Sequence, residues 1–251
     1  IVNPYHLWLV VVLISGINLF SYVLHKKFGN RQGLYLSGFL GGLMSSTMTN
    51  HVLTNKSTTE TISGQNNLAI SNFLAFIGSL IPISFFIAIL NAGLFIQILP
   101  VILLMIFVTI IFILFIKGKY NQPTIQTVNI PSQKKPDLFL VPAIKFALLL
   151  TAVKIISGLA LIFWDNQGFL LASIISSLVG IDAIVINVAE MAKATISINY
   201  GIFVILIINI VNLFGKWIYS YWQGSRTFSR LNLYLLILIS IISFIWYANI
   251  I

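Results

Sequence analysis

Asp182 is the acidic residue whose position most directly suggests chemistry. The chain holds five Asp and Glu residues, and Asp182 is the one that lies well inside an apolar segment, 168–189. A carboxylate at that depth costs about 3 kcal/mol on insertion scales, so it normally faces a polar interior and has a partner. Two interpretations follow: an ion or proton site, or a structural hydrogen bond or ion pair between helices.

Lys145 and Lys154 are the cations that the sequence places near Asp182 in depth. If segments 138–163 and 168–189 form a helical hairpin, Asp182 lies about 25 Å from the turn, Lys145 about 31 Å and Lys154 about 17 Å. The two lysines fall on opposite faces of one helix, so only one of them can point at Asp182. We expect Lys145 to balance Asp182; the alternative is that Lys145 snorkels to the interface.

A second polar cluster lies in segment 33–53. It concentrates hydroxyl and amide groups within two turns, and Ser46 and Asn50 share a helix face. Such a cluster can replace part of the hydration shell of an ion or bind a polar solute, and it can also join helices by hydrogen bonds. Its members are Ser45, Ser46, Thr47, Thr49 and Asn50.

Segment 198–221 carries a polar face of its own. Asn209, Asn212 and Lys216 follow one another at steps of three and four residues, so they line one side of a helix. Lys216 is interpreted as an interfacial anchor, whereas Asn212 needs a partner inside the protein. We include Asn212 among the candidate ligands of a small ion or polar solute.

No motif predicts an enzyme, a metal centre or a cofactor. The chain has no cysteine, which excludes thiolate chemistry, and its three histidines are too dispersed for a metal cluster. It contains no HExxH, P-loop, GxSxG or GxGxxG pattern. We therefore expect a binding or transport protein without catalytic residues.

Composition identifies the environment of these residues. Of 251 residues, 59% are hydrophobic and 8% are charged, which excludes a water-soluble globule. The fold class predicted is an all-α, polytopic transmembrane bundle, because the apolar runs match the length of a helix that crosses a bilayer. Its partner is the lipid bilayer and not nucleic acid, since the basic residues gather between apolar runs. The eight segments are 4–25, 33–53, 67–90, 94–117, 138–163, 168–189, 198–221 and 231–251.

The order of the segments suggests an internal duplication. Shifting the second half by 135 residues aligns Gln32-Gly33 with Gln167-Gly168 and Thr47 with Asp182, and so superimposes the two segments richest in small residues. We predict a first membrane repeat at 1–117, a polar linker at 118–137 and a second repeat at 138–251. Small residues allow close helix contact, and the candidates for this role are Gly38, Gly41, Gly42 and Gly180.

Two topologies remain open. If all eight segments cross, the basic linker falls on the face opposite to the other two basic loops, against the positive-inside rule. If segments 33–53 and 168–189 are re-entrant and enter from opposite sides, all three basic loops share one face. The halves then become inverted repeats of three crossings each.

Four motifs resemble a bacterial membrane domain of unknown function, domain of unknown function 4010, which often follows an MgtC/SapB-type domain. The stretch 33–47, GLYLSGFLGGLMSST, is similar to its GGL-x-SST signature, and PAIKF at 142–146 to its PALKF motif. IDA at 181–183 looks like the end of D-x-DA, and NLFGK at 212–216 like N-x-x-x-K. The resemblance spans about residues 4–240.

The resemblance implies a set of site residues but no established activity. Gly180 stands where the family usually has the first acid of D-x-DA, and Met48 where it usually has Ala. Losing one acid argues against a divalent-ion mechanism. The residues that the family pattern selects here are Gly42, Ser45, Ser46, Thr47, Lys145, Asp182, Asn212 and Lys216.

These observations favour a transport-type protein of the bacterial inner membrane, with a polar site between the two halves for a small ion or polar solute. The alternative is a non-transporting module that binds an upstream MgtC-like domain, another membrane protein or a second copy of itself. The first residue is not a methionine, and we expect the chain to be a fragment or a C-terminal module rather than a signal-peptide precursor.

Overall fold

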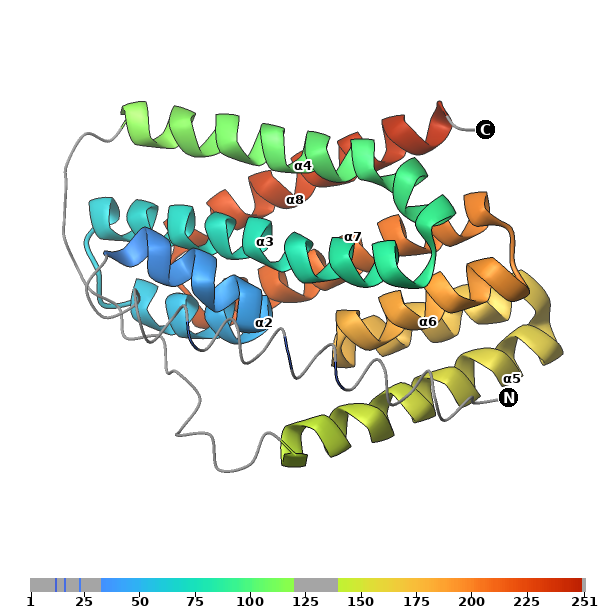
Figure 1. Ribbon diagram of the computed structural model, residues 1–251. Coiled ribbons are helices and arrows are strands. Elements are labelled where there is room, and N and C mark those ends of the chain that lie inside the picture. Colours follow the sequence, from blue (N-terminus) through green and yellow to red (C-terminus); the bar gives the residue numbers. More distant parts are fainter. Residues whose placement is uncertain (1–11, 13–15, 17–22, 24–32, 120–139, 250–251) are drawn as a thin grey trace.

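The computed structural model describes residues 33–119 and 140–249, together with the isolated residues 12, 16 and 23. The secondary structure of this part of the chain is all-helical, as the composition predicts. Most of the predicted segment 4–25 and nearly all of the linker 118–137 lie outside the described residues. The helices are α2 (Leu34–Ser57), α3 (Ile62–Leu90), α4 (Ala92–Lys119), α5 (Leu140–Val179), α6 (Ile181–Ala194), α7 (Ile198–Gln223) and α8 (Arg226–Ala248) (Figure 1).

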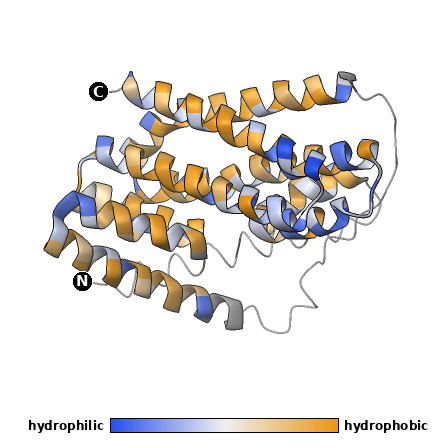
Figure 2. Cartoon of the chain, turned by 180° about the vertical axis from the view of Figure 1, so that it is seen from behind, coloured by the Kyte–Doolittle hydropathy of each residue, from blue (hydrophilic) through white to orange (hydrophobic). Residues whose placement is uncertain are grey.

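Five of these helices are long and apolar enough to cross a membrane, which makes the chain a multi-pass membrane protein. They are α3, α4, α7, α8 and the part of α5 that begins at Lys145. Apolar residues dominate the middle of these helices and hydrophilic ones gather near their ends (Figure 2). Large side chains such as Phe107, Phe115 and Ile162 are exposed on the outside of the bundle. Such a surface suits contact with lipid rather than water.

Helix α2 consists of two half-helices that form a hairpin. Ser45 leaves the helical conformation, with φ −166° and ψ 100°. Before this break, Gly38 packs on Ser71 and Gly42 on Ala75, so the first half runs parallel to α3. After the break the chain runs back and reaches α3 through a short turn (Figure 1). The segment predicted at 33–53 is therefore not one continuous helix.

A second hairpin extends from α5 into α6. The chain leaves the helical conformation at Trp164 and Asp165, where φ of Asp165 is 50°. Its ψ of −147° puts Asp165 outside the αL region that Asp tolerates, in a conformation that favours glycine, so the backbone is strained at this turn. Residues 166–179 run back into the bundle, Gly180 breaks the helix with φ −174° and ψ 120°, and α6 returns (Figure 1). The predicted segment 168–189 is thus also interrupted, and this hairpin enters from the end opposite to the first.

Basic residues gather at the end of the bundle where the first hairpin enters. Lys117 at the end of α4 lies 5.9 Å from the ring centroid of Tyr35 at the start of α2. The backbone N–H of Ser225 donates to Ser57 Oγ at 2.9 Å, so the α7–α8 turn and Arg226 lie at the same end. The turn from α6 to α7 lies at the opposite end (Figure 1).

Glycine lets the first hairpin contact α3 backbone to backbone. A Cβ added to Gly42 would lie 2.1 Å from the carbonyl oxygen of Ala75, and one added to Gly38 would lie 2.3 Å from that of Ser71. Gly41 is buried as well. The prediction of close packing is wrong for Gly180, because an added Cβ would meet Leu149 at an ordinary 3.5 Å. Gly180 instead marks the helix break.

Replacing Gly42 with alanine is expected to destabilise the protein by about 1–3 kcal/mol, the usual cost of overpacking. The matched control is Gly158→Ala, since an added Cβ on Gly158 meets nothing within 4 Å. Thermal unfolding in detergent measures both variants. Equal stability of the two would contradict the backbone contact between α2 and α3.

Candidate binding site

The tips of the two hairpins meet at a cavity of about 710 Å³. Residues 42–48 of the first hairpin and 180–183 of the second line it, together with side chains of α7. Both helix breaks, at Ser45 and Gly180, therefore open into the same space. The sequence-predicted residues that line it are Gly42, Ser45, Ser46, Thr47, Gly180, Asp182, Asn212 and Lys216.

Ser45 organises the tip of the first hairpin. Its hydroxyl accepts a hydrogen bond from the N–H of Met48 at 3.3 Å, and its carbonyl accepts one from the Thr49 hydroxyl at 2.9 Å. It thus caps the second half-helix, as serine does at many helix starts. Ser45 and Thr47 are exposed to the cavity, whereas Ser46 is buried. Hydroxyl groups and the positive end of a half-helix face the cavity together.

Asp182 lies in the first turn of α6, directly after the second break. Its side chain is exposed to the cavity, and no cation of the described residues lies within 4.0 Å of its carboxylate. Gly180 at the N-cap supplies no side-chain hydrogen bond. The carboxylate therefore sits beside the uncapped, positive end of a helix, a position that favours negative charge.

Lys216 of α7 lines the same cavity as Asp182. Its ammonium donates a hydrogen bond to Ser46 Oγ at 2.9 Å, joining α7 to the tip of the first hairpin. Its interpretation as an interfacial anchor is wrong, because α7 continues two turns beyond it to Gln223. Ser46 meets Lys216 because the chain turns back at Ser45, next to it. The sequence, read as one segment at 33–53, does not predict this contact.

The predicted pairing of Lys145 with Asp182 is not observed. Lys145 is exposed and does not line the cavity, although its neighbours Phe146 and Leu149 do. Lys154, the other candidate, forms an ion pair with Glu190 instead. The spacing of the two lysines predicts that they lie on opposite faces of one helix, but it does not predict which face is turned towards Asp182.

The two asparagines of α7 have different surroundings. Asn212 donates to the carbonyl of Ser177 at 3.5 Å, which links α7 to the half-helix before Gly180. Asn209 is buried away from the cavity, with Nδ2 3.8 Å from the sulfur of Met105. Asn50 is fully buried and lines a separate small cavity, not the large one.

Sequence reasoning missed His51. The imidazole stacks on Tyr219 with ring centroids 3.8 Å apart and planes at 16°, and both residues line the cavity. The available signal was the i,i+4 spacing of Thr47 and His51, which places them on one face. Within the described residues, no group of three His, Cys, Asp or Glu side chains could hold a metal ion. The cavity thus combines hydroxyls, one carboxylate, one ammonium and two half-helix starts.

Fold and site define a class: a multi-pass helical membrane protein in which two broken helices meet at a cavity that holds a carboxylate and an ammonium group. A family model described as "Domain of unknown function (DUF4010)" matches residues 12–224. The chain belongs to this family. No curated protein and no solved structure matches the chain.

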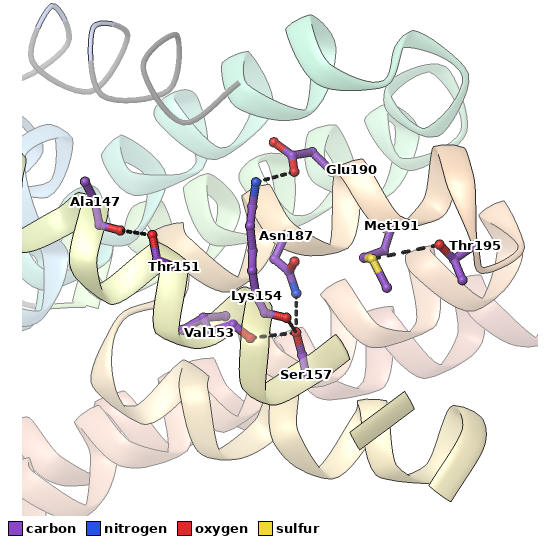
Figure 3. Close-up of polar contacts among 9 residues, drawn as sticks. All are labelled: Ala147, Thr151, Val153, Lys154, Ser157, Asn187, Glu190, Met191 and Thr195. Atoms are coloured by element: carbon purple, nitrogen blue, oxygen red, sulfur yellow. Dashed lines mark hydrogen bonds and ion pairs between the residues drawn. The ribbon is translucent and has the colours of Figure 1, made fainter. Parts of the chain in front are cut away.

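A partly buried ion pair joins α6 of the second hairpin to the spanning part of α5. Lys154 Nζ lies 2.5 Å from Glu190 Oε2, and the two side chains are 10% and 20% exposed (Figure 3). One turn away, Asn187 Nδ2 donates to Ser157 Oγ at 2.7 Å (Figure 3). Polar contacts inside an apolar bundle specify which faces of α5 and α6 meet.

The variant Lys154→Met is expected to lose about 3–5 kcal/mol of stability, because it leaves the Glu190 carboxylate buried without a partner. The double variant Lys154→Met/Glu190→Leu should recover most of that loss, since neither charge then remains. Thermal unfolding in detergent compares the two. A double variant less stable than Lys154→Met would show that the pair is not what couples these helices.

Proposed function

We propose that the chain is built from two inverted repeats, 1–117 and 138–251, joined by the linker 118–137. The two helix breaks support this proposal, because Ser45 and Gly180 lie 135 positions apart, the shift that aligns the two halves in sequence. The following helices keep nearly the same offset: α3 begins at Ile62 and α7 at Ile198. Equal spacing of breaks and helices is what a duplicated unit produces.

The hairpins enter from opposite ends of the bundle, which supports the inverted relation (Figure 1). In this arrangement the described basic residues Lys56, Lys117 and Arg226 lie at one end. By the positive-inside rule this end is cytoplasmic, and the membrane is the bacterial inner membrane.

We propose that the protein transports a small ion or polar solute through the cavity between the hairpin tips. The observation that carries the proposal is that both broken helices open into one cavity holding Asp182 and Lys216. Backbone groups freed by a helix break are tolerated at membrane depth where protein or water surrounds them, and transporters use such groups to bind their cargo. Alternating access would follow from movement of one repeat against the other.

Cysteine labelling tests the topology directly, because the natural chain has no cysteine. Thr59 follows the first hairpin and Thr195 the second, and both are exposed. We expect Thr59→Cys and Thr195→Cys to react with a membrane-impermeant maleimide from opposite faces of the membrane. Permeabilised cells, in which both should react, provide the control. Labelling of both from the same face would contradict the hairpins and favour eight crossings.

Flux across proteoliposomes tests the site. Gradients of sodium, potassium, chloride, acetate and glycine are applied in turn, and solid-supported membrane currents or tracer uptake are measured. We expect Asp182→Asn to lower the flux of the transported species at least about tenfold, which corresponds to an increase of about 1.4 kcal/mol in the activation free energy of transport. Asp165→Asn is the matched control, because Asp165 is exposed in a turn and does not line the cavity.

Unchanged flux in Asp182→Asn would remove this carboxylate from the mechanism. If no species moves and a stoichiometric protein partner co-purifies, the alternative role as a non-transporting interaction module is favoured instead. In that case the small-residue faces of the hairpins are the surfaces to map.

A further inference from the structure

A second, smaller cavity of about 20 Å³ lies behind the tip of the first hairpin. Four helices meet there: α2 after its break, α3, α7 and α8. The polar residues that line it are Ser46, Asn50, Asn72, Lys216 and Asn232. A space of this size accepts one water molecule or one monatomic ion, and it excludes an organic solute.

Asn50 is the residue of this cavity that lacks a partner. Its side chain is 0% exposed, and neither Nδ2 nor Oδ1 makes a hydrogen bond. The neighbouring amides are engaged: Asn72 Nδ2 donates to Asn232 Oδ1 at 2.9 Å, and Asn232 Nδ2 to Ser220 Oγ at 3.2 Å. A buried amide without any partner normally marks a bound water or ion, because leaving it unpaired costs free energy.

The charge of the lining selects among these ligands. Lys216 brings an ammonium with two N–H donors left after its bond to Ser46. No carboxylate of the described residues lines the small cavity, since Asp182 lines only the large one. A cation in the small cavity would face the Lys216 ammonium with no carboxylate in the same lining, whereas an anion gains a charge-assisted hydrogen bond from Lys216.

We propose that this small cavity binds one monatomic anion, with chloride as the physiological ligand, between the Lys216 ammonium and the Asn50 amide. Ser46 and Lys216 line both cavities, so an occupied anion site contacts the same side chains as a solute in the large cavity. Through these two side chains, anion binding in the small cavity affects the conformation of the hairpin tip. The site does not require that the large cavity transports anything.

Thermal unfolding of the purified protein in detergent tests the proposal, with sodium chloride replacing sodium gluconate at constant ionic strength. We expect the unfolding temperature to rise with chloride and to saturate, because a ligand that binds the folded state stabilises it. Bromide should act similarly. In Asn50→Leu the half-saturating chloride concentration should rise at least about tenfold, while Asn199→Leu, which changes an exposed asparagine of α7, should behave as wild type.

Three outcomes would overturn the proposal. An unfolding temperature independent of chloride in the wild type means that water alone fills the cavity. Dependence on sodium when choline replaces it at constant chloride means that the site holds a cation. A chloride effect retained in Asn50→Leu but lost in Lys216→Met places the anion in the large cavity. The wild-type measurement decides the first two outcomes even if a variant does not fold, and flux across proteoliposomes remains an independent test of transport.

Discussion

The structure depends on one constraint: backbone polar groups freed by a helix break must find partners where no lipid reaches them. The breaks at Ser45 and Gly180 meet this constraint differently. Ser45 caps its own half-helix through its hydroxyl. On the other side, Asn212 of α7 reaches the carbonyl of Ser177 just before Gly180. Bringing both breaks to one cavity lets the surrounding helices shield them together.

The described charged residues inside the bundle are of two kinds, paired and unpaired. Lys154 and Glu190 neutralise each other where α5 and α6 pack, and this pair orients the second hairpin. Asp182 and Lys216 instead face an open cavity, without a direct ion pair between them. Charges held apart in this way remain available to a ligand, whereas paired charges serve packing. The hydrogen bond from Lys216 to Ser46 joins α7 to the tip of the first hairpin.

Residue types and spacing predicted much of the candidate site. Hydroxyls at Ser45, Ser46 and Thr47 and the intramembrane Asp182 were identified because such groups are costly in hydrocarbon. The partners of these groups cannot be identified in the same way. The depth of a lysine along a helix does not say which face of the helix it occupies or whether the neighbouring segment turns back. For that reason the sequence points to Lys145 as the partner of Asp182 and to Lys216 as an interfacial anchor, and it does not predict the pairing of Lys154 with Glu190.

By itself, the sequence determined the helical membrane class, the two unusual segments and the 135-residue offset between them, since these follow from hydropathy, small-residue content and order along the chain. Only the tertiary structure decided that both segments are hairpins and that their tips share a cavity with Lys216. The physical reason is that one residue in an extended conformation reverses a helix, and a change confined to two dihedral angles leaves no pattern in composition or period.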